Sequence, residues 1–382
     1  MFLRTFGWSF GITLLGLAAA AYFWGATGFG IVLILSILEI SLSFDNAVIN
    51  ATVLKRMNPF WQRIFLTVGV LIAVFGMRLL FPLIVVALTA HMNPVTVVQL
   101  ALDETKTYNG LTYAQHLTAA HPAIAAFGGM FLLMIFLDFI LGEKEIRWLE
   151  WIERPLEKIG KLDQLSVVIA LIALMLSSRF FAGDRAETVL LAGVAGLTTY
   201  LAVGGLANLF ESEGDEDEDG DADGDGDGEE TASAGKGAGK GSSVAGVTGK
   251  AAFFLFLYLE VLDASFSFDG VVGAFAITQD VFQITLGLGI GAMYIRSLTV
   301  YLVRQGTLDD YVYLEHGAHY AIGALATILL VSIKYEIPEV VTGLIGVAFI
   351  GLALLSSILR NKREGRPSEL AAAQEEDALP KL

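Results

Sequence analysis

Long apolar segments constrain the fold of this chain more than any other feature. Each holds about 20 nearly uncharged residues, enough for a helix to cross a bilayer. The chain is 55% hydrophobic, and the alternation of transmembrane strands is absent. We therefore predict an all-α polytopic protein embedded in a lipid bilayer. Its ten expected spans are residues 8–24, 28–54, 62–89, 122–141, 164–182, 187–210, 251–277, 281–304, 317–334 and 338–360.

Lysine and arginine are distributed unevenly between the predicted loops. With the N-terminus in the cytoplasm, eighteen of them fall inside and four outside, as the positive-inside rule requires. We therefore expect a multi-pass protein of the plasma (inner) membrane with both termini cytoplasmic. Residues 8–24 also fit a signal peptide, because Arg4 precedes them and alanines follow. The parity of the loop charges favours a retained span.

The composition divides the chain into four regions. These are a first transmembrane half at 1–210, a linker at 211–250, a second transmembrane half at 251–360 and a cytoplasmic tail at 361–382. Thirteen acidic residues between Glu211 and Glu230 account for most of the net charge of −16. The linker has no apolar face, so we predict that it is disordered.

Part of the linker matches a calcium-loop pattern. Residues 219–230 read D-x-D-x-D-G with a glutamate at position twelve, as in an EF-hand. However, Gly226 stands where that loop needs a β-branched residue, and no helix pair flanks it. A solvated spacer or a loose anionic brush that concentrates cations fits better. The absence of cysteine excludes disulfides and thiolate metal sites, and no basic patch indicates nucleic acid.

The pattern of residues 143–161 predicts an interfacial helix within the first transmembrane half. Its apolar stripe consists of Ile146, Leu149, Ile152 and Leu156. Trp148 and Trp151 suit the headgroup zone, and basic residues line the other side. We expect this helix to anchor the protein at the membrane surface.

One polar motif occurs twice within the apolar segments. The copies are EISLSFDN from Glu39 and DASFSFDG from Asp263, aligned without a gap at an offset of 224 residues. The alignment pairs Glu39 with Asp263, Ser41 with Ser265, Ser43 with Ser267, Phe44 with Phe268 and Asp45 with Asp269. The copies lie on the second and the seventh predicted spans, an offset of five, so they run in opposite directions. Two halves in inverted topology are typical of secondary transporters.

The motifs carry hard oxygen ligands at membrane depth, where an unpaired carboxylate is costly. The candidate metal ligands are Glu39, Asp45, Asn46, Glu260, Asp263 and Asp269, supported by Ser43 and Ser267. Oxygen ligands without cysteine or histidine favour Mn²⁺, Mg²⁺ or Ca²⁺ over Cu⁺ or Zn²⁺. A protonated or paired structural network is the alternative reading of these carboxylates.

Helical geometry predicts a break in the first motif. One face of a straight helix would carry Glu39, Ser43, Asn46 and Asn50. Asp45 would point roughly 120° away from Glu39, so the two acids converge only if the helix unwinds or kinks near Asp45. In the second copy, Gly270 would tolerate a similar break.

Arg78 and Arg296 lie within predicted spans, and two readings of them stay open. Each could pair with a motif acid and replace the cation in an empty site. Each could instead extend along its helix to the interface, because long side chains snorkel.

Four further positions have polar side chains near the predicted inner face. Glu315 and His319 share a helix face next to His316. One reading is an ion access point or a pH sensor. The simpler reading is that they are interfacial residues packed beside tyrosines. Asp138 is expected to be a buried acid with a structural hydrogen bond.

The residues of the two motifs resemble the TerC family of integral membrane proteins. The resemblance rests on Ser43–Ala47, Asp263–Asp269, the two span arginines and Tyr313–Gly317. It implies a manganese exporter or tellurite-resistance protein, with Asp45, Asn46, Asp269, Glu39 and Asp263 lining the metal site. The family's second motif continues with a serine and, two residues later, a proline, whereas this chain has Gly270 and Val272. The chain therefore resembles a divergent branch.

These observations favour a non-enzymatic secondary transporter that exports a divalent cation, with Mn²⁺ favoured, by alternating access and exchange against protons. One alternative is a transporter of oxyanions or organic solutes with arginine clamps. Another is a membrane scaffold that responds to metal stress. An intramembrane hydrolase is disfavoured because no nucleophile–base pair or zinc motif is present.

Overall fold

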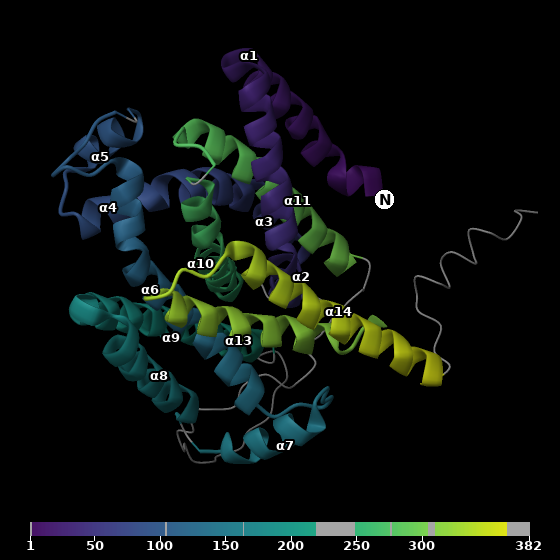
Figure 1. Ribbon diagram of the computed structural model, residues 1–382. Helices are drawn as coiled ribbons and strands as arrows, with labels where there is room; N and C mark the ends of the chain where they lie inside the picture. Colours follow the sequence, from purple (N-terminus) through teal and green to yellow (C-terminus); the bar gives the residue numbers. More distant parts are fainter. Residues whose placement is uncertain are drawn as a thin grey trace, which may run out of the picture.

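The computed structural model describes residues 2–103, 105–162, 164–218, 249–275, 277–304 and 310–364. This part of the chain is helical and contains no β-strand (Figure 1). Its elements are α1 (Phe2–Leu42), α2 (Phe44–Leu54), α3 (Pro59–Leu71), the π-helix η1 (Ile72–Leu80), α4 (Phe81–Thr89), α5 (Pro94–Ala101), α6 (Tyr113–Leu141), α7 (Glu150–Ile159), α8 (Leu165–Phe181), the 3-10 turn η2 (Gly183–Arg185), α9 (Ala186–Glu218), α10 (Gly249–Ala274), α11 (Val281–Arg304), α13 (Leu314–Ser332) and α14 (Glu339–Glu364).

Eight helical segments of the described chain are long and apolar enough to cross a membrane, and α8 is a shorter apolar helix. This confirms a polytopic helical membrane protein, whereas ten spans in two inverted halves stay a prediction. The predicted spans 8–24 and 28–54 meet within α1, whose backbone leaves the helical region at Gly25 (φ 68°, ψ −160°). Figure 1 shows α1 as two arms joined at a sharp bend.

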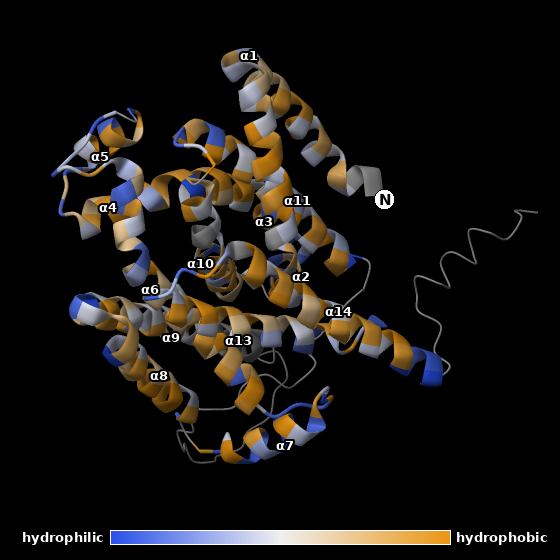
Figure 2. Ribbon diagram, in the orientation of Figure 1, coloured by the Kyte–Doolittle hydropathy of each residue, from blue (hydrophilic) through white to orange (hydrophobic). Residues whose placement is uncertain are grey.

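Figure 2 shows apolar residues along most of these helices. Leu14, Leu88 and Leu344 are among the exposed large hydrophobic residues. Such exposure would be unfavourable in water, but it suits a bilayer. The hydropathy pattern therefore marks the lipid-facing surface.

Both arms of α1 pack against α11. In the first arm, Ser9 Oγ lies 2.8 Å from Ser297 Oγ. In the second arm, Ser36 Oγ donates to the Gly287 carbonyl oxygen at 3.0 Å. A Cβ on Gly287 would lie 2.6 Å from Leu35 Cβ, so the helices approach closely because residue 287 has no side chain. This contact sets the position of the first motif against α11.

The predicted interfacial helix is shorter than expected, since α7 covers Glu150–Ile159 and the residues before it are not helical. Trp151 is exposed, as an interfacial anchor should be. Trp148 instead packs edge-on against Tyr320 of α13 at 5.8 Å. One end of α7 is therefore attached to the helix bundle.

A fully buried carboxylate makes that attachment. Glu153 accepts hydrogen bonds from the Trp148 and Leu149 amides at 3.3 and 3.2 Å and from the Tyr320 hydroxyl at 3.1 Å. We expect Glu153→Ala to lower the free energy of unfolding by about 1–3 kcal/mol, because these donors lose their acceptor. Thermal unfolding in detergent checks this, with the exposed Glu150→Ala as control. Equal effects of the two changes would contradict this role for Glu153.

The predicted linker falls largely outside the described residues. Residues 219–248, which include the calcium-loop pattern, are not described, and neither is the tail beyond residue 364. The helix α9 continues to Glu218, eight residues past the expected boundary at 210.

Candidate functional site

The chain breaks within the first motif, between α1 and α2. Ser43 has φ −99° and ψ 16°, outside helical geometry, and it occupies the N-cap position of α2 without a side-chain capping hydrogen bond. Its hydroxyl donates to Glu39 Oε1 at 3.2 Å. The break predicted near Asp45 therefore occurs two residues before it. The second motif shows no such break, because α10 continues through Gly270 to Ala274.

Arg78 pairs with the first acid of the first motif. Its Nη2 donates to Glu39 Oε1, and its Nη1 donates to the Ala73 carbonyl oxygen at 2.8 Å. The exposed fractions of Arg78 and Glu39 are 3% and 4%. Arg78 lies in the π-helix η1, a form that often occurs at functional sites.

Arg296 pairs with two acids of the second motif region. It contacts both carboxylate oxygens of Glu260 at 3.0 Å and Asp263 Oδ2 at 3.4 Å. Its guanidinium stacks 4.2 Å from the centre of the Phe65 ring, and its Nη1 donates to the Phe65 carbonyl oxygen at 3.3 Å. A Cβ on Gly69 would lie 2.4 Å from Arg296 Nη1. Thus α3, which precedes Arg78 in the chain, encloses the Arg296 cluster.

Both arginines therefore pair with the acids that the motif alignment equates, Glu39 and Asp263. This agrees with the reading in which each arginine neutralises its motif. The snorkelling reading is wrong, because Arg78 and Arg296 are buried rather than extended to the interface. Paired charges are the form in which ionic groups are tolerated inside a membrane.

The two motifs approach each other. A Cβ on Gly270 would lie 3.3 Å from Glu39 Oε2, which places the backbone next to Asp269 beside the first motif. Arg78 also lies within electrostatic range of Glu260. The side chains of Asp45 and Asp269 are outside the described part of the chain. Their backbones belong to the first turn of α2 and to α10 beside Gly270.

The motif serines divide into two kinds. Ser41 and Ser265 each donate to the carbonyl oxygen four residues earlier, at 2.8 and 2.9 Å. Ser267 is buried, and its Oγ has no hydrogen-bond partner in the described structure. Asn46 is also buried. Ser267 thus retains free ligand capacity.

No three His, Asp or Glu side chains of the described residues converge as metal ligands. In this arrangement Glu39, Glu260 and Asp263 are each paired with an arginine. A cation would therefore require the aspartates Asp45 and Asp269, displacement of an arginine, or both.

Apolar clusters lie on both sides of the charged groups along two helices. Along α10, Leu259 precedes Glu260 and Val271 follows the motif. Along α11, Leu288 precedes Arg296 and Val300 follows it. Leu288 and Val271 belong to one apolar cluster, and Leu259 and Val300 belong to another. The polar centre is thus enclosed by apolar layers.

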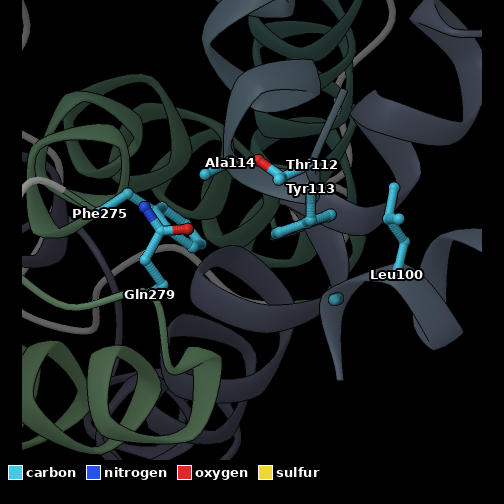
Figure 3. A pocket seen from close by; sticks show the side chains of 7 residues that line it. Leu100, Thr112, Tyr113, Ala114, Phe275 and Gln279 are labelled. Carbon is cyan, nitrogen blue, oxygen red and sulfur yellow. The ribbon is translucent and has the colours of Figure 1, made fainter. Parts of the chain in front are cut away.

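The small pocket in Figure 3 does not overlap this centre. Leu100, Tyr113, Phe275 and Gln279 line it, where α5, the start of α6 and the α10–α11 connection meet. No acidic side chain lines it. The pocket therefore offers no oxygen-rich cation site.

The polar residues at the start of α13 are packed rather than open. His316 Nε2 lies 2.9 Å from the Ile146 carbonyl oxygen and 3.7 Å from Glu153 Oε2. The His319 ring stacks on Phe139 at 3.8 Å. These contacts favour the packing reading over an ion access point. Lys144 lies half-buried with its Nζ over the Phe139 ring, and this burial lowers the pKa of its ammonium.

Asp138 differs from expectation in one respect. It accepts a hydrogen bond from the Tyr200 hydroxyl at 2.5 Å, as predicted. Its side chain is exposed rather than buried, because it lies on the rim of the α6–α9 contact.

The helices and their enclosed charge pairs define a multi-pass helical membrane protein with a polar centre shielded from water and lipid. The chain belongs to the family described as protein of unknown function (DUF475), whose model matches residues 44–364. It is similar to the uncharacterized membrane protein YceF of Bacillus subtilis (strain 168), with 29% identity over 120 residues. That stretch covers 31% of this chain and 45% of the relative, so the chain spans less than half of the relative's length. No solved structure matches significantly.

Proposed function

We propose that this protein is a secondary transporter that exports a divalent cation, with Mn²⁺ favoured, by alternating access. In this proposal the two motif-bearing halves are inverted repeats, and the cation binds where they meet. The protein lies in the plasma (inner) membrane with both termini in the cytoplasm. The excess of lysine and arginine in the loops on that side supports this orientation.

One observation carries the proposal: in each motif region a buried arginine pairs with buried motif carboxylates, Arg78 with Glu39 and Arg296 with Glu260 and Asp263. The two regions, more than 200 residues apart in sequence, also approach each other, since a Cβ on Gly270 would lie 3.3 Å from Glu39 Oε2. A structural role explains a single buried pair poorly, because apolar residues of the same volume often stabilise as well. Two aligned copies are harder still to explain by packing. Intramembrane charges commonly mark ion paths.

The charge balance suggests how the site could accept and release a cation. The described groups, Glu39, Glu260 and Asp263 against Arg78 and Arg296, are nearly neutral without any guest. Asp45 and Asp269 add negative charge, and Asn46 adds a neutral oxygen ligand. When a divalent cation or protons bind to the carboxylates, the arginines separate from these carboxylates. Exchange of metal for protons avoids a bare charge in the membrane.

The resemblance to the TerC family supports manganese as the transported ion and export as the direction of transport. We propose that the chain is related to that family on the basis of the same motif residues. The oxygen-only ligand set suits Mn²⁺ and also Mg²⁺ or Ca²⁺. Whole-cell metal content with and without the protein, across Mn, Mg, Ca, Fe and Zn, separates these ions.

Transport of an oxyanion or organic solute is the second candidate. Its arginine clamps would need free guanidinium groups, whereas Arg78 and Arg296 are both engaged by carboxylates. A non-transporting membrane scaffold is the third candidate function. A protein of this kind should show no metal-dependent shift of its melting temperature.

Flux measurements test the proposal directly. We expect Asp45→Asn with Asp269→Asn to abolish Mn²⁺ flux in reconstituted vesicles, because both candidate carboxylate ligands become neutral amides. Asp138→Asn, which changes an exposed acid outside the cluster, should retain flux. Flux that survives the double change would refute the assignment.

A further inference from the structure

Asn50 is a buried amide without a partner. Its exposed fraction is 0%, and neither Nδ2 nor Oδ1 has a hydrogen-bond partner within the described structure. By contrast, Asn58 Oδ1 and Asn93 Oδ1 each accept a backbone amide at the starts of α3 and α5. A buried amide that lacks partners costs free energy. Its retention therefore requires another reason.

Asn50 continues the line of polar residues beyond the motif. It lies one helical turn after Asn46 on α2 and one turn before Leu54, on the same face. Leu54 packs with Leu259 of α10 and Val300 of α11 in one apolar cluster. Along α2, Asn50 thus lies between Asn46 of the first motif and the apolar cluster that contains Leu54.

We propose that Asn50 is an additional ligand for the transported cation, one turn from the acidic cluster toward the Leu54 side. This inference rests on the proposed transport of a hard divalent cation. The amide oxygen of Asn50 replaces a water ligand of the cation as the cation passes between the motif acids and the apolar cluster that contains Leu54. Because the amide is neutral, it can bind and release the cation without a change in charge.

The proposal predicts opposite effects on stability and on metal binding. We expect Asn50→Leu to raise the melting temperature of the metal-free protein by about 2–4 °C, because an unsatisfied polar group is replaced by an apolar group of similar size. The same change should weaken Mn²⁺ binding about tenfold, measured as the concentration that produces half of the thermal shift in detergent. A purely structural asparagine would show the reverse effect on stability.

Asn58→Leu is a matched control, since it removes a side-chain cap of α3 outside the charged centre. It should lower the melting temperature and leave the Mn²⁺ concentration dependence unchanged. Asn50→Asp keeps an oxygen donor at the position, and it should retain Mn²⁺ binding within a factor of about three.

Each outcome has a distinct meaning. If the wild-type protein shows no Mn²⁺-dependent shift, the transport proposal and this inference both fail. If the wild type binds Mn²⁺ and Asn50→Leu binds it equally well, only the inference fails. A lower melting temperature for metal-free Asn50→Leu would also overturn it, because Asn50 would then have a stabilising partner.

Discussion

Arg78→Gln is expected to lower the free energy of unfolding by about 3–5 kcal/mol, because it leaves Glu39 buried without its counter-charge. Adding Glu39→Gln should restore most of this loss, since the second change removes the uncompensated charge. The amide introduced by this second change can still accept a hydrogen bond from Ser43. Thermal unfolding in detergent measures both effects, and together with the single variant Glu39→Gln they complete the cycle that gives the coupling energy of the pair.

Cation flux should not recover in the double variant, because the candidate site has lost both a ligand and its counter-cation. Arg154→Gln is the control for loss of an arginine from an exposed pair. Arg154 lies 3.6 Å from Glu150, and both side chains are exposed, so its effect should be within about 1 kcal/mol. Equal losses for Arg78→Gln and Arg154→Gln would show that the buried pair does not hold the site together.

Gly291→Ala is expected to have the second large effect. A Cβ at this position would lie 2.4 Å from Glu39 Cβ and 3.1 Å from the Ser36 carbonyl oxygen. The second arm of α1 would have to move away from α11, since backbone cannot give way as a flexible side chain does. We expect a loss of about 1–3 kcal/mol in the free energy of unfolding and a strong reduction of flux.

The matched control is Gly351→Ala in α14, where no atom lies within 4 Å of an added Cβ. This exposed helical position should be unaffected or stabilised by up to about 1 kcal/mol. Purified protein in detergent and reconstituted vesicles provide the two measurements. Wild-type stability and flux for Gly291→Ala would contradict the close packing of α1 on α11.

The break at the first motif was predictable because Glu39 and Asp45 cannot share one face of a straight helix. The break occurs at Ser43, whose hydroxyl donates to Glu39 Oε1 and does not cap the new helix. The same reasoning failed for the second motif. There Gly270 allows Glu39 to approach α10 rather than breaking α10, and no periodicity within α10 encodes an approach from α1.

Two residues important in the structure escaped sequence reasoning for different physical reasons. Glu153 belongs to an amphipathic stretch whose acids and bases suggest a solvated face, but Tyr320 and backbone amides bury it. Asn50 lies on the predicted polar stripe, so its direction was foreseeable. Its lack of a partner was not, because that depends on what the neighbouring helices place opposite it.

The sequence by itself determined that the chain forms membrane-spanning helices, because a bilayer forces each apolar segment to satisfy its own backbone hydrogen bonds. It also determined which residues bring charge to the membrane interior, because their positions within the apolar segments can be read directly. Only the tertiary structure decided that Arg78 pairs with Glu39, that Arg296 holds Glu260 and Asp263 under Phe65, and that Asn50 has no partner. Those pairings depend on contacts between helices far apart in the chain, and the geometry of such contacts follows from packing rather than from any local pattern.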